Sequence, residues 1–399
     1  MAVEERIKGE DKHMIDEIVS RMHGYVIRDE HIPWRFVDRE AEVWNMVDEE
    51  GVVEGGWITV LYGPKGCGKS TLFSALRYSL AELEREGFES GYELVYVSAK
   101  PRVSWDVSRA YSSKDLWGLL AEAVSSLGGS LDQSGVVKGL VDAAKLIAIL
   151  VDRIARKFEN GKNILIVLDE ARASGRESLG AFRDWLEVFA NDIREDNRVY
   201  SRRRGSIAVA VLTSDALVEE IMDIVGGKVN WAFMWNLSRI SSEELITQIG
   251  LHYRVARELG IGSEESRELL WRLAGGNPRA LERIWKRGLK RWLEGEVLTR
   301  LSKFVEKMQK TFGERLWEEL WSAASNIDDA DIDFKTAMLK RNIAIYIAAA
   351  DKISEIPSEP WIGREYAFQI PAYYHALKAM ARKRSRRISP EDVIREAMA

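Results

Sequence analysis

Cysteine is almost absent from this sequence, because Cys67 is the single cysteine among 399 residues. One thiol can form neither an internal disulfide framework nor a cysteine-based zinc site, and it indicates a reducing, cytoplasmic setting. The 5 histidines show no metal-ligand spacing, and no serine–histidine–aspartate order of a hydrolase is apparent. The chemistry of the chain is therefore expected from other residue types.

Long apolar runs are missing as well. The first residues, MAVEERIKGEDKHMIDEI, are charged and lack the apolar core of a signal peptide. The most apolar segment, from about residue 136 to 155, is interrupted by charged side chains and indicates a buried amphipathic helix. We therefore expect no membrane-spanning segment, which would need a longer uninterrupted stretch.

The chain also lacks an excess of positive charge. Its formal net charge is −5, whereas proteins that bind polyanions usually show a basic balance or a basic face. Local basic clusters occur at 202–204 and at 382–387. An apolar content of 46% is sufficient for sizeable cores, and the length predicts two or three domains.

Short apolar runs alternate with helical segments through the first part of the chain, after a mostly polar and helical stretch over residues 1–34. Such alternation, with strands that are apolar on both faces, predicts a parallel sheet covered by helices on each side. From residue 241 to about 325 the pattern is almost entirely helical. The predicted strands lie near residues 57–62, 93–97, 164–168, 207–212 and 231–235.

The residues after the first of these strands match G-x-x-x-x-G-K-[ST] in full and precede a predicted helix. Small residues allow consecutive backbone N–H groups to form a concave anion site, and the helix adds its N-terminal dipole. Lys69 can reach the β- and γ-phosphates of a nucleotide, while Ser70 offers a hydroxyl to Mg²⁺. The predicted nucleotide contacts here are Gly63, Pro64, Lys65, Gly66, Cys67, Gly68, Lys69, Ser70 and Thr71.

Two acids follow the most hydrophobic strand. The carboxyl ends of parallel strands face the ligand crevice, so Asp169 and Glu170 are expected near the nucleotide. Asp169 is the candidate Mg²⁺ residue, and Glu170 is placed to polarise the attacking water. A solvated acidic turn is the alternative, and the phosphate loop makes it the weaker interpretation.

Hydroxyl groups follow the next strand at the same edge of the predicted sheet. Thr213 or Ser214 could orient the water or sense the γ-phosphate. Capping of the following helix by either residue, or by Asp215, explains them equally well.

A Gly-Gly-Asn-Pro-Arg segment, residues 275–279, separates two helices of the helical region. Gly-Gly is a typical helix stop and Asn-Pro a typical helix start, which explains the segment structurally. A helix that begins there could also bring Pro278 against the base and Arg279 toward the phosphates.

Together these motifs resemble the archaeal ATPase family, which is related to the STAND and AAA+ branches of P-loop NTPases. The resemblance covers about residues 35–290 and implies that Val37 and its neighbours help to seat the adenine. It also implies that residues 276–278 touch the nucleotide from a helical lid and that Arg279 is a sensor-2 residue. The matching segments are Phe36–Glu40, Gly63–Ser70, Leu168–Ala171, Leu212–Ser214 and Gly275–Pro278.

The resemblance predicts an α/β fold: a P-loop NTPase parallel sheet flanked by helices, followed by an all-helical lid and a winged-helix-like C-terminal domain. Residues 365–374 resemble the last wing strand and helix of such a domain. The expected domains are an N-terminal helical extension at 1–34, the ATPase core at 35–239, the lid at 240–325 and the C-terminal domain at 326–399.

Two departures bear on mechanism. STAND proteins of the apoptotic type carry an arginine after the fourth strand, where this chain has Thr-Ser-Asp at residues 213–215. AAA+ rings carry an arginine finger before the last core strand, but residues 216–229 contain no arginine. A ring with trans-activated hydrolysis is therefore disfavoured, and slow intrinsic hydrolysis suits a nucleotide switch better than a motor. Either a monomer or a nucleotide-dependent oligomer fits the sequence.

The resemblance thus implies an ATPase that uses ATP and Mg²⁺ and binds a protein partner through its C-terminal module. The alternative is a DNA-binding ATPase resembling origin-recognition initiators, with the basic cluster at 382–387 on the phosphates of duplex DNA. The preference for ATP over GTP is implied by the resemblance alone, and no N-K-x-D-type guanine motif is evident.

Overall fold

The computed structural model describes residues 2–28, 33–47, 53, 55–98, 119, 122–123, 126, 140–157, 161–169, 176–202, 205–213, 227, 229–348 and 350–399. The chain divides into two compact units. The first unit comprises residues 1–25, 39–62 and 69–233, and the second comprises residues 26–38, 63–68 and 234–399.

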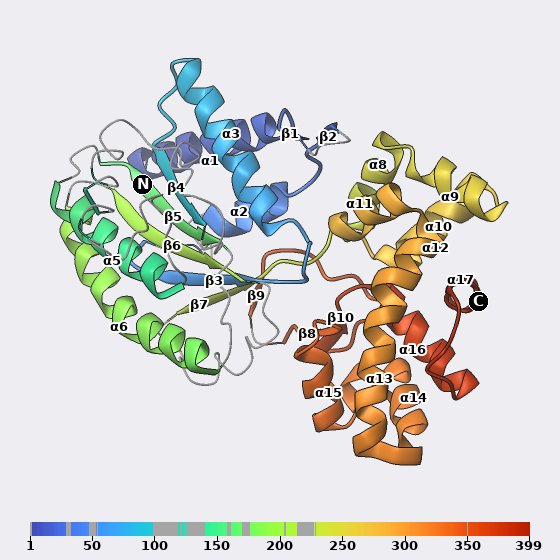
Figure 1. The fold of residues 1–399 in the computed structure, drawn as a ribbon. Helices are drawn as coiled ribbons and strands as arrows, with labels where there is room; N and C mark the ends of the chain where they lie inside the picture. Colours follow the sequence, from blue (N-terminus) through green and yellow to red (C-terminus); the bar gives the residue numbers. More distant parts are fainter. Residues whose placement is uncertain are drawn as a thin grey trace. The chain divides into compact units, whose positions relative to one another are not determined.

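A parallel sheet forms the centre of the first unit (Figure 1). Its strands follow the order β4-β5-β6-β3-β7, and each neighbouring pair runs parallel. Nearly all described side chains of β3, β5 and β6 are buried, which explains their continuous apolar runs. The parallel sheet predicted from the sequence is confirmed. The strands are β3 Ile58–Tyr62, β4 Tyr92–Ser98, β5 Asn163–Asp169, β6 Ser206–Leu212 and β7 Asn230–Phe233.

Helices cover both faces of this sheet. Figure 1 shows α1 (Ala2–Met22), α2 (Glu40–Val47) and α3 (Lys69–Arg85) on one side, and α5 (Leu140–Lys157) with α6 (Arg176–Ser201) on the other. Helix α3 buries one apolar face, as its periodicity predicts, and α5 packs along α6. The buried leucines of α3 are Leu72, Leu76, Leu80 and Leu83.

The second unit is mainly helical. Its residues 239–325 are almost entirely helical, in agreement with the sequence pattern. Residues 289–312 form one helical segment with a π-helical turn, η4, in its middle. The elements are α8 Arg239–Gln248, α9 Leu251–Leu259, α10 Ser263–Ala274, α11 Pro278–Arg287, α12 Leu289–Trp292, η4 Leu293–Leu298, α13 Thr299–Phe312, η5 Gly313–Arg315 and α14 Leu316–Ser325.

The last part of the second unit contains a small β-ribbon and a helix pair. Strand β10 pairs antiparallel with β8, and Phe368 lies opposite Ala344. Helix α16 packs on α10, α14 and α17. The predicted final strand and helices are therefore present, whereas the winged-helix assignment and the domain boundaries stay predictions. The elements are η6 Ile327–Asp329, α15 Ile332–Leu339, β8 Ala344–Tyr346, β9 Asp351–Lys352, β10 Tyr366–Phe368, α16 Pro371–Lys383 and α17 Pro390–Met398.

The N-terminal segment differs from its expected pattern. The helix ends at Met22, and β1 (Val26–Arg28) then pairs antiparallel with β2 (Pro33–Arg35) in the second unit. Strands of three residues are too short to show an alternating pattern, so the sequence could not separate them from the preceding helix.

No helix among the described residues is long and apolar enough to cross a membrane.

Candidate nucleotide site

The phosphate loop joins the end of β3 to the start of α3 along the chain. Gly66 and Gly68 have φ angles of 90° and 107°, a region that glycine adopts far more readily than other residues. A Cβ atom on Gly63 would lie 2.0 Å from the carbonyl oxygen of Met234, and one on Gly66 would lie 2.4 Å from Cβ of Arg279. Each glycine of the motif therefore has a conformational or steric reason to be glycine.

The first half of the loop is held by groups from elsewhere in the second unit. The Lys65 N–H donates to Oε1 of Gln369 at 3.1 Å, and the Lys65 carbonyl accepts from Nδ2 of Asn277 at 3.2 Å. The Gly66 carbonyl accepts from the Arg279 N–H at 3.4 Å. These bonds fix the backbone on which the second half of the loop is built.

Asn277 has two structural tasks. Its Oδ1 accepts from the Ala280 N–H at 3.0 Å and caps α11, with Pro278 at the first helical position. Its Nδ2 donates to the loop and also to Oδ1 of Asn236 at 2.8 Å. The helix start that the sequence predicts at this segment is therefore confirmed, and the same residue also contacts the phosphate loop.

The two glycines before Asn277 allow close packing. Gly275 ends α10 in the left-handed conformation, and a Cβ atom on it would lie 2.5 Å from Cδ of Pro371. A Cβ atom on Gly276 would lie 2.2 Å from the carbonyl oxygen of Leu237. The helix stop therefore also allows the start of α16 and the segment after β7 to pack against the junction of α10 and α11.

The candidate residues of the first unit lie where their elements begin or end. Lys69 is the first residue of α3 and is 8% exposed, and Ser70 and Thr71 follow in its first turn, half-buried. Asp169 is the last residue of β5 and is 4% exposed. Thr213 follows β6, is buried, and donates its N–H to the Leu61 carbonyl at 3.0 Å.

Asp169 has a partner that the sequence alone did not indicate. The Tyr96 hydroxyl of β4 donates to the Asp169 carboxylate. In the register of β4 and β5, Ser98 lies opposite Asp169, which brings Tyr96 within reach two residues away. A phenol hydroxyl on a buried carboxylate lowers the cost of keeping that group charged away from water.

Some predicted residues cannot be placed. Glu170, Ser214 and Asp215 lie outside the residues that the structure describes. Among the described residues, no group of three or more histidine, cysteine, aspartate or glutamate side chains could hold a metal ion by itself. Mg²⁺ usually needs only one or two carboxylates, with the remaining ligands from water and phosphates, and the buried Asp169 carboxylate and Ser70 hydroxyl suit that donor set.

The upstream motif contains a strained turn. Asp38 and Arg39 have φ angles of 61° and 86°, which cost non-glycine residues about 1–2 kcal/mol each. Asp38 accepts from the Ser241 hydroxyl at 2.6 Å in the second unit, and Arg39 forms a buried ion pair with Glu42 in the first. Val37, which precedes the turn, is 6% exposed. The two polar contacts offset the strain and hold this conformation.

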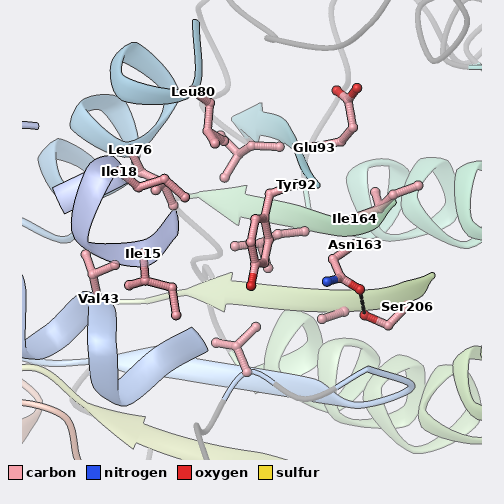
Figure 2. Close-up of a pocket in the computed structure, with 14 residues that line it drawn as sticks. Ile15, Ile18, Val43, Leu76, Leu80, Tyr92, Glu93, Asn163, Ile164 and Ser206 are labelled. Carbon is pink, nitrogen blue, oxygen red and sulfur yellow. Dashed lines mark hydrogen bonds between the residues drawn. The ribbon is translucent and has the colours of Figure 1, made fainter. Parts of the chain in front are cut away.

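A separate cavity of about 130 Å³ lies in the first unit (Figure 2). Its walls include Tyr92, Asn163 and Ser206, which are the first residues of β4, β5 and β6, and apolar side chains of α1 and α3. Ser206 donates to Asn163 at 2.8 Å on this wall. The cavity therefore lies at the amino ends of these strands, whereas Asp169 and Thr213 lie at or after their carboxyl ends.

Comparison with protein families gives a match over residues 36–284 to an ATPase domain found predominantly in Archaea. The chain belongs to this ATPase family. The match includes the phosphate loop, Asp169, Glu170, Thr213 and residues 275–279, and it ends inside α11. The chain is thus a nucleotide-binding ATPase, as the motifs indicated.

Solved structures and curated proteins were compared as well. A chain in the structure of Drosophila ORC bound to DNA is 13% identical, with 78% of this chain and 88% of that chain covered and a TM-score of 0.34. The Aeropyrum pernix ORC2 protein in ADPNP–ADP complexes is 14% identical, with 77% and 85% covered and a TM-score of 0.33. Comparison with curated proteins gives no match.

Proposed function

We propose that this ATPase hydrolyses ATP slowly with Mg²⁺ and acts as a nucleotide-controlled switch. The observation that carries the proposal is the phosphate loop itself. Its glycines occupy positions that require glycine, and Lys69 and Ser70 begin the helix that follows it. A backbone of this kind is built to bind the phosphates of a nucleotide.

The proposed roles follow from charge and position. Lys69 neutralises the β- and γ-phosphates, and Ser70 with Asp169 would hold Mg²⁺, which when bound supplies further neutralisation of phosphate charge. Tyr96 orients the Asp169 carboxylate through its hydroxyl. Glu170 orients the attacking water, and Thr213 reports the γ-phosphate.

The lid is proposed to read the nucleotide through α11. The Arg279 N–H bonds the loop carbonyl of Gly66, so the side chain of Arg279 starts next to the loop. We assign Arg279 the sensor role, and we assign Pro278 and Val37 to the base. The nucleotide can shift the lid between an open and a closed state only if ATP and ADP bind these two states with different affinities.

Binding and turnover test this proposal. Calorimetric titration with ATP and Mg²⁺ and a phosphate-release assay compare wild type with Lys69→Ala and with Lys340→Ala. Lys340 is an exposed lysine of the second unit and serves as the matched control. We expect Lys69→Ala to lose ATP binding and Lys340→Ala to behave as wild type. Equal binding by all three proteins would contradict the role of the loop lysine.

The output of the switch is proposed to be a protein partner rather than duplex DNA. The DNA alternative depends on the basic cluster at 382–387, and several of its cations are already engaged. Arg382 pairs with Glu396 at 2.8 Å, Lys383 with Asp392 at 2.6 Å, and Arg386 with Glu306 at 3.2 Å. Cations that neutralise carboxylates of their own chain contribute less to phosphate binding and counterion release.

Duplex retention at two salt concentrations separates these outputs. Wild type is compared with Arg384→Gln/Arg387→Gln, which removes the two remaining cations of the cluster. Weak retention that does not change in the variant is the expected result for a protein-binding module. Tight retention that falls steeply with salt and weakens in the variant would favour the DNA alternative.

A cytoplasmic location is part of the same proposal, because the lone cysteine lies in the phosphate loop.

A further inference from the structure

We propose that Gln369 is a positioning residue of the nucleotide site, which holds the phosphate loop by the Lys65 amide and so couples nucleotide affinity to the β8–β10 ribbon. Gln369 lies between β10 and α16, 304 residues after Lys65 in the sequence. It is 3% exposed. The inference rests on the proposed function, because the loop must bind a nucleotide.

The orientation of the Gln369 amide is determined by backbone groups. Its Oε1 faces the Lys65 N–H, which can only donate, and its Nε2 faces the Ala344 carbonyl at 3.4 Å, which can only accept. Nε2 also donates to Oδ1 of Asn342 at 3.3 Å. Reversing the amide would place its NH₂ group against the Lys65 N–H and its oxygen against the Ala344 carbonyl, so that neither hydrogen bond could form. The bond to the loop is therefore a fixed feature of the site.

Gln369 is joined to the lid contact of the same loop residue. Its backbone carbonyl accepts from Nδ2 of Asn236 at 3.2 Å, and Oδ1 of Asn236 accepts from Asn277. Asn277 in turn donates to the Lys65 carbonyl. Both backbone groups of Lys65 are thus held by one connected set of amides, of which Asn236 and Asn277 are each 2% exposed. Buried amides that satisfy one another form a rigid group, because losing one bond leaves the next group unpaired.

This arrangement connects the loop with the C-terminal part of the second unit. The Gln369 N–H donates to the Ile343 carbonyl at 3.0 Å, which fixes Gln369 to the ribbon next to β8. Two residues later Pro371 begins α16 and packs against Gly275. A shift of β10 or α16 must therefore move Oε1 away from the Lys65 amide. A partner that displaces this segment would loosen the loop, and by reciprocity a bound nucleotide would stabilise the segment.

Gln369→Met tests the proposal, because methionine has a similar length and offers the Lys65 N–H only a weakly accepting thioether sulfur in place of an amide oxygen. Gln309→Met is the matched control, because it makes the same substitution at an exposed glutamine of α13. ATP affinity is measured by titration with Mg²⁺. In the same proteins, hydrogen exchange of residues 343–346 and 366–369 is followed with and without ATP.

We expect wild type and Gln309→Met to bind ATP alike, and Gln369→Met to bind about five- to tenfold more weakly, which corresponds to one buried hydrogen bond. ATP should slow exchange of the ribbon in wild type and leave it unchanged in Gln369→Met. Equal affinity in Gln369→Met, or a wild-type ribbon that does not respond to ATP, overturns the coupling. If Gln369→Met does not fold, the wild-type exchange result alone decides. Failure of wild type to bind ATP would instead overturn the proposed function.

Discussion

Gly66 shows how a single atom can determine whether the phosphate loop forms. Its backbone has a φ angle of 90°, and the space where a Cβ atom would lie is taken by Arg279. A side chain at this position would therefore strain the backbone and push the start of α11 away from the loop. The glycine therefore permits both the loop conformation and the contact of the loop with the start of α11.

Gly66→Ala is expected to weaken ATP binding at least tenfold and to lower the free energy of unfolding by about 2–4 kcal/mol, from backbone strain together with overpacking. Gly87→Ala is the matched control, since Gly87 has a φ angle of 83° but open space around its Cα. The control substitution should lower the free energy of unfolding only by the backbone strain, about 1–2 kcal/mol, and leave the ATP affinity unchanged. Chemical unfolding and ATP titration measure both effects. Equal losses of stability in the two variants would contradict the steric argument.

His375 is a buried titratable residue of α16 with a different consequence. Burial, together with the nearby charges of Lys378 and Arg272, lowers the pKa of His375 from 6.5 to about 3. The side chain is 6% exposed, and its ring lies 4.8 Å from that of Tyr374 and 6.3 Å from that of Trp361. The histidine is therefore neutral in the folded chain at neutral pH.

The sign of the pH effect follows from this pKa. Below pH 6.5, His375 is protonated in the unfolded chain but stays neutral in the folded chain. The free energy of unfolding therefore falls as the pH decreases toward 3. We expect His375 to account for a loss on the order of 2 kcal/mol between pH 7 and pH 5. The loss should be absent in His375→Gln and retained in His13→Gln, which changes an exposed histidine. Thermal unfolding at the two pH values measures it, and identical acid sensitivity in both variants would refute the assignment.

At the scale of elements, helix α11 combines a cap with a contact to the phosphate loop. Asn277 and Ser389 are both N-caps followed by proline, at α11 and α17 respectively. Ser389 forms a capping box within its own helix, whereas Asn277 also donates to the Lys65 carbonyl and to Asn236. The two caps therefore form a natural pair for separating capping from loop support.

Ser389→Ala should lower the free energy of unfolding by about 1 kcal/mol, the usual effect of removing an N-cap, and leave ATP affinity unchanged. Asn277→Ala should lower the free energy of unfolding by about 2–4 kcal/mol, because it also removes the donor to the buried Asn236 oxygen and the hydrogen bond to the Lys65 carbonyl. It should weaken ATP binding as well. Urea unfolding and ATP titration distinguish these outcomes. If Asn277→Ala lowers stability no more than Ser389→Ala does, the amide set does not support the loop.

The elements also show what the sequence can and cannot predict. Strand β5 is an apolar run that ends in an acid, and the glycine loop follows β3 directly, so both could be assigned from local pattern. Tyr96, Asn236 and Gln369 could not, because their importance depends on strand register and on packing between distant segments. The ribbon β1–β2 was missed for a different reason, since each strand has only three residues.

At the scale of the whole molecule, the residues assigned to the nucleotide come from distant parts of the chain. The loop follows β3 along the chain, Asp169 and Thr213 lie at or after the carboxyl ends of β5 and β6, and the Arg279 N–H at the start of α11 bonds the Gly66 carbonyl. The family match ends at residue 284, but Gln369 lies beyond it and still bonds the loop. The C-terminal part of the second unit thus takes part in shaping the loop.

The most direct test of the ATPase account is phosphate release in a single turnover, comparing wild type with Glu170→Gln after both are loaded with ATP and Mg²⁺. Glutamine preserves the size of Glu170 but cannot polarise the attacking water. The account predicts that both proteins bind ATP with similar affinity, that wild type releases phosphate slowly, and that Glu170→Gln releases at least a hundredfold more slowly, as expected for loss of a general base. Equal release rates in the two proteins, or ATP binding without any release by wild type, would contradict it.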